Sequence, residues 1–181
     1  MSATGRPAGL TPSQTIGPFW HDALDRPDLS GMTAGSNSNL LTLHGTITDA
    51  QGTPVGDAMV EVWHADADGG HGGNGRDRFH RCATDARGRF ELRTFRPGGW
   101  TDADGTVHAA HITIGLFARG LLNRLHTRAY FAGDPALDQD AVLALVPANR
   151  RATLLARPDG PQAWAFDIRL SGDGETVFLA C

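Results

Sequence analysis

The chain has 181 residues and a formal net charge of −4, and its length suits one domain with its own core. All 16 basic residues are arginine, so no mechanism that needs a lysine amine is open to this chain. Tyr130 is the only tyrosine, which excludes a site in this chain built on two tyrosines. The negative charge argues against nucleic acid or an anionic membrane as the main partner.

Targeting signals are not evident in the sequence. No apolar run approaches the ~20 residues of a membrane span, and residues 1–10 lack the apolar stretch of a signal peptide. The two cysteines, Cys82 and Cys181, form neither a disulfide framework nor a C-x-x-C motif. We therefore expect a cytoplasmic protein with reduced thiols.

Residues 1–38 show no clear hydrophobic period, and we expect an N-terminal arm, extended or loosely helical, that packs on a partner chain. Proline and glycine are frequent in its stretch Thr11-Pro-Ser-Gln-Thr15-Ile-Gly17-Pro18-Phe19. These residues fix a backbone path and permit close approach to a ligand or another chain. An ordinary N-terminal turn is the alternative interpretation.

Residues 39–181 predict one all-β domain, because alternating segments are separated by glycine and proline. In residues 40–48, the side chains at 41, 43, 45 and 47 share one face. The Asp85-Ala-Arg-Gly88 sequence predicts a hairpin turn. We therefore predict a two-sheet β-sandwich with long loops. The expected strands are residues 40–48, 58–65, 79–84, 89–95, 111–118, 127–132, 163–170 and 175–180.

One short helix is expected over residues 139–146. Asp138 stands where an N-cap residue is favoured, and Pro147 ends the helical pattern.

Two stretches invite comparison with metal sites. His64-Ala-Asp66-Ala-Asp68-Gly-Gly-His71 offers oxygen and nitrogen donors, but it fails as a calcium loop: His71 occupies the glycine position, and no glutamate closes the loop. His111-Ile-Thr113 has the spacing at which two strand residues face one metal. Threonine is a poor ligand there, so a hydrogen-bonded His111 is the simpler interpretation.

Arg119 stands beside Gly120 at the end of a predicted strand. From this place its planar guanidinium can face a carboxylate ligand, and a surface salt bridge is the alternative.

Taken together, the sequence resembles the intradiol ring-cleaving dioxygenases, and within them the alpha-type chain of the two-chain members that cleave protocatechuate. The resemblance runs in order through nearly the whole chain. The stretches that carry it are T-P-S-Q-T-I-G-P-F (11–19), L-H-G-T-I-T-D-A-Q-G (43–52), V-E-V-W-H-A-D-A (60–67), A-H-I-T-I-G-L-F-A-R-G (110–120), L-H-T-R-A-Y-F (125–131) and F-D-I-R-L-S-G-D-G-E-T-V-F (166–178).

The resemblance implies a non-haem ferric ion held by two tyrosines and an H-x-H pair, and this chain departs at nearly every ligand. One tyrosine position falls at about His71, and the other falls in residues 96–100, which contain no tyrosine. The H-x-H pair is His111-x-Thr113, while Tyr130 is not at a ligand position. We expect no metal site and no catalytic residue in this chain.

What the resemblance implies is a division of labour between two chains. An iron-bearing beta subunit would supply the Fe(III), and this chain would complete the substrate pocket at the interface. Carried over by position, Thr15, Gly17 and Pro18 would line that pocket, and Arg119 would approach the substrate carboxylate. The implied reaction is protocatechuate plus O2 giving 3-carboxy-cis,cis-muconate, in a larger assembly of αβ units.

Two other functional hypotheses stay open on the sequence alone. One is a β-sandwich binding module that has lost its metal and works without a beta partner. The other is a self-sufficient enzyme that uses His64, His71, His80 and His111 on another metal.

Overall fold

The computed structural model describes residues 11–29, 31, 40–72 and 78–180. Helix α1 spans Trp20–Leu24 and α2 spans Ala141–Leu145, with short 3-10 turns at Pro27–Leu29, Leu137–Gln139 and Arg151–Leu154. The strands are β1 Leu40–Thr48, β2 Ala58–His64, β3 Phe79–Ala83, β4 Arg89–Phe95, β5 Trp100–Thr101, β6 Val107–His108, β7 His111–Ala118, β8 Leu125–Phe131, β9 Leu155–Pro158, β10 Ala163–Ala165 and β11 Ile168–Arg169.

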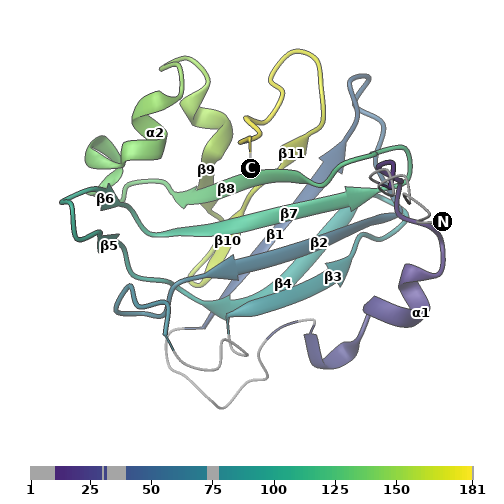
Figure 1. Ribbon diagram of the computed structural model, residues 1–181, viewed down its shortest axis with the longest axis horizontal. Helices are drawn as coiled ribbons and strands as arrows, with labels where there is room; N and C mark the ends of the chain where they lie inside the picture. Colours follow the sequence, from purple (N-terminus) through teal and green to yellow (C-terminus); the bar gives the residue numbers. More distant parts are fainter. Residues whose placement is uncertain (1–10, 30, 32–39, 73–77, 181) are drawn as a thin grey trace, which may run out of the picture.

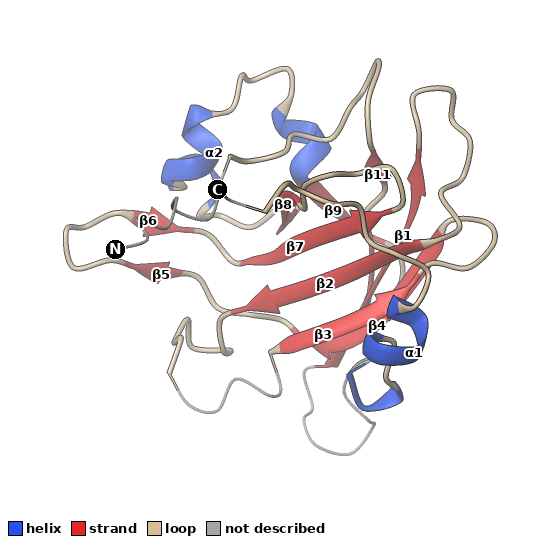
Figure 2. Ribbon diagram, turned by 45° about the vertical axis from the view of Figure 1, so that its right-hand side comes forward, coloured by secondary structure: helices blue, strands red, loops and turns tan. Residues whose placement is uncertain are grey.

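The strands form two walls around one core, as Figures 1 and 2 show. The first wall has the order β3-β2-β7-β8, and the second contains β4, β1, β10 and β11. Strand β9 joins the walls, because it pairs in parallel with β8 and antiparallel with β10. The predicted all-β sandwich is confirmed, and its two walls run on into one sheet that is nearly closed like a barrel.

Strand β1 shows how the sequence pattern builds this core. Its residues alternate between half-buried and buried, with Leu41, Leu43 and Ile47 facing inward, as the alternation predicts. Across the core, Ile112, Ile114 and Leu116 of β7 are fully buried. Burial of these aliphatic side chains supplies the main stabilisation of the sandwich.

The predicted hairpin at Asp85–Gly88 is only half correct. The turn forms: the Gly88 N–H donates to the Asp85 carbonyl at 2.8 Å, and the Asp85 carboxylate accepts the Arg87 and Arg89 N–H groups. The flanking strands do not pair, because β3 pairs with β2 and β4 pairs with β1. The turn therefore carries the chain from one wall to the other.

The C-terminal quarter also departs from prediction. The expected strand 163–170 is broken in two, because the Asp167 carboxylate accepts the Thr46 N–H in place of a backbone carbonyl. The expected strand 175–180 is wrong, because this stretch is irregular. It is held by isolated hydrogen bonds to both walls, such as the bond from the Leu179 N–H to the His126 carbonyl at 2.7 Å.

Helix α2 lies within the predicted residues 139–146, but its cap differs. Asp140, not Asp138, is the N-cap, and its carboxylate accepts the Leu143 N–H at 2.7 Å. Asp140 is fully buried at the start of the helix, whereas Asp138 is exposed, and this difference explains why Asp140 is the N-cap. No helix among the described residues is long and apolar enough to cross a membrane.

A second helix, α1, was not expected as a regular element and lies in the arm. Its Trp20 is buried, and the Leu24 carbonyl accepts a bond from Arg81 of β3. In Figure 1, α1 lies beside β3 and α2 lies at the opposite end of the molecule. The described part of the arm thus packs on its own sheet, and packing of residues 1–38 on a partner chain stays a prediction.

Candidate functional site

The arm meets the end of β7 through the hydroxyl of Thr15. Thr15 Oγ1 donates to the Ala118 carbonyl at 3.2 Å and accepts from the Gly120 N–H at 2.8 Å. Arg119 lies between these two anchor residues in the chain. The structure therefore brings Thr15 and Arg119 together, although a hundred residues separate them in sequence.

Gly17 and Pro18 follow Thr15 on the exposed side of the arm. The Gly17 carbonyl accepts the Trp20 N–H at 3.3 Å, which starts α1. A Cβ added at Gly17 would meet nothing within 4 Å, so no neighbour among the described residues requires glycine there. The contribution of Gly17 and Pro18 to a substrate pocket stays a prediction.

Asp57, just before β2, organises the charges beside Arg119. Its Oδ2 pairs with Arg119 Nε, and its Oδ1 contacts His21 Nε2 of α1 at 2.7 Å. The Arg119 side chain remains 63% exposed. An exposed ion pair contributes only about 0–1 kcal/mol, so the guanidinium remains available to a second anion. We call Thr15, His21, Asp57 and residues 118–120 the Arg119 corner.

Sequence reasoning missed Asp57 in this corner. Gly56-Asp57 resembles an ordinary turn before a strand, and no spacing motif links it to Arg119. Only the three-dimensional approach of α1, β2 and the end of β7 makes this carboxylate a partner of both His21 and Arg119.

A second group of interest surrounds Trp100, and we call His71, Trp100, His108, His111 and Tyr130 the Trp100 cluster. The Trp100 ring stacks on His108 at 4.7 Å between centroids and meets the edge of His71 at 4.4 Å. It also lies 5.1 Å from His111, which in turn lies 5.2 Å from Tyr130. Residues that are far apart in sequence thus share one aromatic cluster.

Backbone packing holds Trp100 in this position. Gly99, directly before it, approaches β6 so closely that a Cβ would lie 2.7 Å from the His108 carbonyl oxygen. At the start of the same loop, Arg96 pairs with Asp134 at 3.1 Å and lies over the Phe131 ring. The loop therefore presents Trp100 inward with little freedom to retract.

Burial keeps the two innermost members of the cluster, His111 and Tyr130, uncharged at neutral pH. Desolvation lowers the pKa of His111 to about 4, helped by the nearby Arg128 charge, so this imidazole is neutral at pH 7. Its Nδ1 lies 2.8 Å from the Ala109 carbonyl. Burial raises the pKa of Tyr130 well above its usual value, and its hydroxyl donates to Asp140 at 2.9 Å.

The His64–His71 stretch uses its polar groups for structure. Asp66 Oδ1 accepts the N–H groups of Asp68 and Gly70, which shapes the turn. His64 faces inward, where its Nε2 and His80 Nε2 both contact the Thr94 hydroxyl, at 2.5 and 3.1 Å. The four histidines of the alternative metal site thus fall into two groups, because His71 and His111 belong to the Trp100 cluster.

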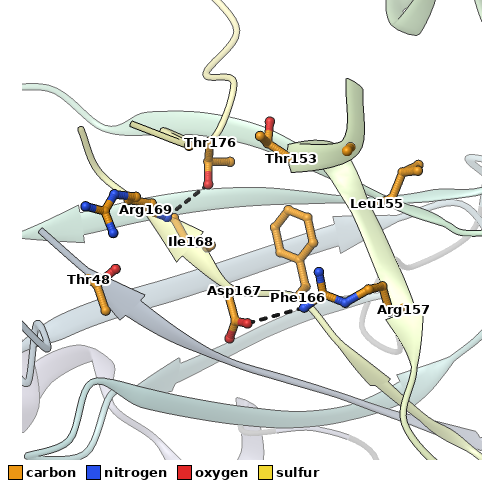
Figure 3. A pocket seen from close by; sticks show the side chains of 11 residues that line it. Thr48, Thr153, Leu155, Arg157, Phe166, Asp167, Ile168, Arg169 and Thr176 are labelled. Atoms are coloured by element: carbon orange, nitrogen blue, oxygen red, sulfur yellow. Dashed lines mark hydrogen bonds and ion pairs between the residues drawn. The ribbon is translucent and has the colours of Figure 1, made fainter. Parts of the chain in front are cut away.

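A separate cavity of about 350 Å³ opens between β1, β9, β11 and the C-terminal segment (Figure 3). Arg157 and Asp167 form a loose pair at 3.5 Å on its wall, and the Arg169 N–H donates to the Thr176 hydroxyl at 3.0 Å. None of the predicted site residues lines this cavity.

Comparison with known proteins places the chain in a family. A family profile described as "Dioxygenase" matches residues 17–172. The chain is 38% identical to the protocatechuate 3,4-dioxygenase alpha chain of Pseudomonas putida, covering 93% of this chain and 95% of that protein. The chain belongs to the intradiol ring-cleaving dioxygenase family.

The chain is also similar to two other kinds of intradiol dioxygenase. The chain is 31% identical to the protocatechuate 3,4-dioxygenase beta chain of Burkholderia cepacia, covering 91% of this chain and 77% of that protein. The structure of catechol 1,2-dioxygenase from Acinetobacter sp. ADP1 superposes with a TM-score of 0.61 at 25% identity. That match covers 81% of this chain, which spans little more than half (57%) of the catechol enzyme.

The ferric ion implied by the intradiol resemblance does not fit the donors at the corresponding positions. Trp100 has only an N–H donor, and Thr113 offers a hydroxyl, so His71 and His111 are the remaining nitrogen ligands. Residues 11–29, 31, 40–72 and 78–180 contain no group of three or more His, Cys, Asp or Glu that could hold a metal ion. We derive no chemical step through a metal bound to this chain.

Proposed function

We propose that this chain is the iron-free alpha subunit of a protocatechuate 3,4-dioxygenase. In this proposal an iron-bearing beta subunit pairs with it, and the substrate pocket lies between the two chains. Support comes from membership of the intradiol family and from the alignment along almost the full length of an alpha chain. Similarity to a beta chain supports a partner of the same fold.

The observation that carries the proposal is the position of Trp100. The resemblance assigns one metal ligand to the loop of residues 96–100, and the indole of Trp100 fills that region between His71, His108 and His111. A stacked indole cannot replace a tyrosinate as a ligand. The redox chemistry of the family would therefore be supplied by a second chain.

Within such a complex, the Arg119 corner would recognise the substrate. Protocatechuate that presents its two hydroxyl groups to the partner's ferric ion directs its carboxylate to the opposite wall of the pocket. Arg119 would meet this carboxylate there, while Asp57 holds Nε and Thr15 fixes the backbone on both sides. Charge-assisted bonds of this kind contribute about 1.5–3 kcal/mol and disfavour plain catechol.

The proposed reaction breaks the ring bond between the two hydroxyl-bearing carbons of protocatechuate. Both atoms of O2 enter the product, 3-carboxy-cis,cis-muconate, so no other oxidant or reductant is needed. The ferric ion of the partner supplies the activation of substrate and oxygen. Thr15, Gly17, Pro18 and Arg119 would contribute binding and orientation.

The cellular setting follows the same proposal. We place the complex in the cytoplasm, in the degradation of aromatic acids through the beta-ketoadipate route. A closed assembly of several αβ units is expected, because a pairwise interface between two similar chains readily repeats around a symmetry axis.

An iron assay with and without the partner tests the proposal. The chain would be expressed alone and together with an iron-bearing beta subunit, and bound iron, visible absorbance and protocatechuate cleavage would be measured on both preparations. We expect iron, colour and activity only in the co-expressed complex. An isolated chain that binds stoichiometric iron and cleaves substrate would overturn the proposal. A chain that stays monomeric beside the beta subunit would favour an independent binding module.

A further inference from the structure

A shallow trough crosses the outer face of β2, β7 and β8. The strand register places Gly115 between His126 and Glu61, and it places Thr113 next to Trp63 on the same face. The central residues are small, so β7 forms a floor between two rows of larger side chains. The hollow measures about 90 Å³. It is lined by Glu61, Val62, Trp63, Phe79, Thr113, Gly115, Arg124 and His126, which we call the His126 trough.

Within the described part of the chain, no helix covers the His126 trough (Figure 1). In Figure 1 this wall lies in front of β1 and β4, and neither α1 nor α2 crosses it. Trp63, at one side of the trough, remains 39% exposed, although the Arg78 guanidinium lies 5.6 Å from its ring centroid. Exposed tryptophan beside arginine is a composition typical of protein–protein contacts.

The charges of the trough are unbalanced. Arg124 is exposed, and its side chain lies over Gly115, with Cδ 3.1 Å from the place of a Cβ. Among the residues that the structure describes, His126 Nδ1 and Arg128 Nε are buried without a hydrogen-bond partner, although Arg128 also donates to the Tyr130 hydroxyl through its terminal nitrogen. Glu61 is the single carboxylate in the lining, and it is already bonded to Arg81. Arg124 is therefore an exposed cation at the mouth of the trough, and the one carboxylate of the lining is already engaged by another arginine.

The titration of His126 agrees with this geometry. Burial lowers its pKa, and the positive charges of Arg124 and Arg128 lower it further. Glu61 and Arg81 face it from β2 and β3 as a mutually bonded pair, and the Leu179 N–H of the C-terminal segment donates to the His126 backbone carbonyl. An anion placed in the trough would reverse the effect of the two arginines and raise the pKa of His126.

The small volume of the trough favours a single acidic side chain over a larger organic anion. Sites for small organic ligands usually measure about 300–1,000 Å³, and this hollow is several times smaller. It suits a single side chain rather than a substituted aromatic ring.

We propose that the His126 trough receives one acidic side chain, an Asp or Glu of the partner subunit, and that the outer face of β2, β7 and β8 is part of the interface between the two chains. The carboxylate pairs with Arg124 at the mouth of the trough and lies beside His126. This inference rests on the proposed two-chain function, because it names where the partner docks.

The absence of lysine from this chain supplies a selective test. Arg124→Lys introduces the only side-chain amine of the chain at the mouth of the trough. A carbodiimide then joins this amine to any carboxylate in contact with it, without a spacer. Arg87→Lys is the matched control, because Arg87 is an exposed arginine in the turn between the two walls.

We expect the Arg124→Lys complex to give one cross-linked peptide that contains an Asp or Glu of the partner subunit, identified by mass spectrometry. Arg87→Lys should not give that product. The proposal is overturned if an assembled, active Arg124→Lys complex gives no cross-link to the partner, or links only to Glu61 of its own chain. Failure of the unmodified chain to assemble with any beta subunit would instead overturn the proposed function.

A binding measurement provides the second readout. Arg124→Glu should raise the Kd of the complex about tenfold at low salt and much less at high salt, because it sets two carboxylates against each other. Arg87→Glu should leave the Kd unchanged. Equal effects of the two charge reversals, or saturation of the trough by acetate without any effect on assembly, would contradict the proposal.

Discussion

The Arg119 corner and the Trp100 cluster illustrate two opposite ways of arranging polar residues. The corner is exposed and charged, and its Arg119–Asp57 pair remains in contact with solvent. The cluster is aromatic, and its inner members His111 and Tyr130 are buried and uncharged at neutral pH. A site that must accept a new anion benefits from the first arrangement, whereas a region without an exchangeable ligand tolerates the second. We therefore expect changes in the cluster to affect stability and changes in the corner to affect binding.

The largest expected effect concerns Asp140, which anchors the cluster. Its carboxylate accepts from the Tyr130 hydroxyl, the Leu143 N–H and the Ala109 N–H. Asp140→Ala leaves three buried donors without an acceptor, so the free energy of unfolding should fall by about 3–5 kcal/mol. Urea denaturation would measure this. Asp138→Ala, at the neighbouring exposed position, should change stability by less than about 0.5 kcal/mol, and similar losses in both variants would contradict this role of Asp140.

The second largest expected effect is a loss of stability at acidic pH. The pKa values of buried His64 and His111 fall from 6.5 to about 4, mainly because burial disfavours the charged ring. The unfolded chain therefore binds more protons between these values, and stability should be lost as the pH falls from about 6.5 to 4. The loss at pH 5 should be roughly 2 kcal/mol per histidine. Urea unfolding at a series of pH values measures how the free energy of unfolding changes with pH, and this slope gives the number of protons taken up on unfolding. His111→Asn should lower that number by about one.

In the Arg119 corner, Arg119→Ala should weaken the binding of protocatechuate without changing the stability of the chain. We expect the KM of the proposed complex for protocatechuate to rise about tenfold, because the carboxylate loses its charge-assisted partner. Substrates without the carboxylate should change much less, and thermal stability should stay within the error of the measurement. Equal losses on both substrate types would mean that Arg119 acts on the structure of the corner.

The smallest effect is expected at Thr15. Thr15→Val removes both bonds between the arm and β7, which should lower stability by about 1 kcal/mol and increase proteolysis of the arm. Thr11→Val, at an exposed position of the same arm, is the control. Unchanged protease sensitivity in Thr15→Val would show that the contacts of α1 anchor the arm without Thr15.

The sequence predicted the regular parts of the sandwich well. Strands β1, β4 and β7 have the predicted bounds. β1 and most of β4 alternate between a buried and a more exposed face, whereas β7 is buried along most of its length and was recognised by its apolar residues at every second position. The pairing of β3 and β4 was wrong, since a turn sequence defines its own geometry but not the partners of the strands that follow. Tertiary burial also selected Asp140 over Asp138, which local capping rules cannot distinguish.

The candidate site was predictable in part, and for different reasons at each residue. Thr15 and Arg119 were found through family resemblance, and they come close only because Thr15 bonds the backbone on both sides of Arg119. Asp57 and Trp100 carry no local motif, so their importance depends on neighbours from other strands. The His126 trough escaped notice because it is formed by small residues, Thr113 and Gly115, whose role is the space they leave.

The parallel pairing of β1 has a consequence for synthesis on the ribosome. Thr42 of β1 lies opposite Ala163 of β10, and Ile47 lies opposite Ile168 of β11. One edge of this apolar strand therefore has no permanent partner until almost the whole chain has been made. During that interval the edge can pair with other nascent chains. Slow translation or low chaperone supply should thus lower the soluble yield of this chain more than changes in its exposed loops do.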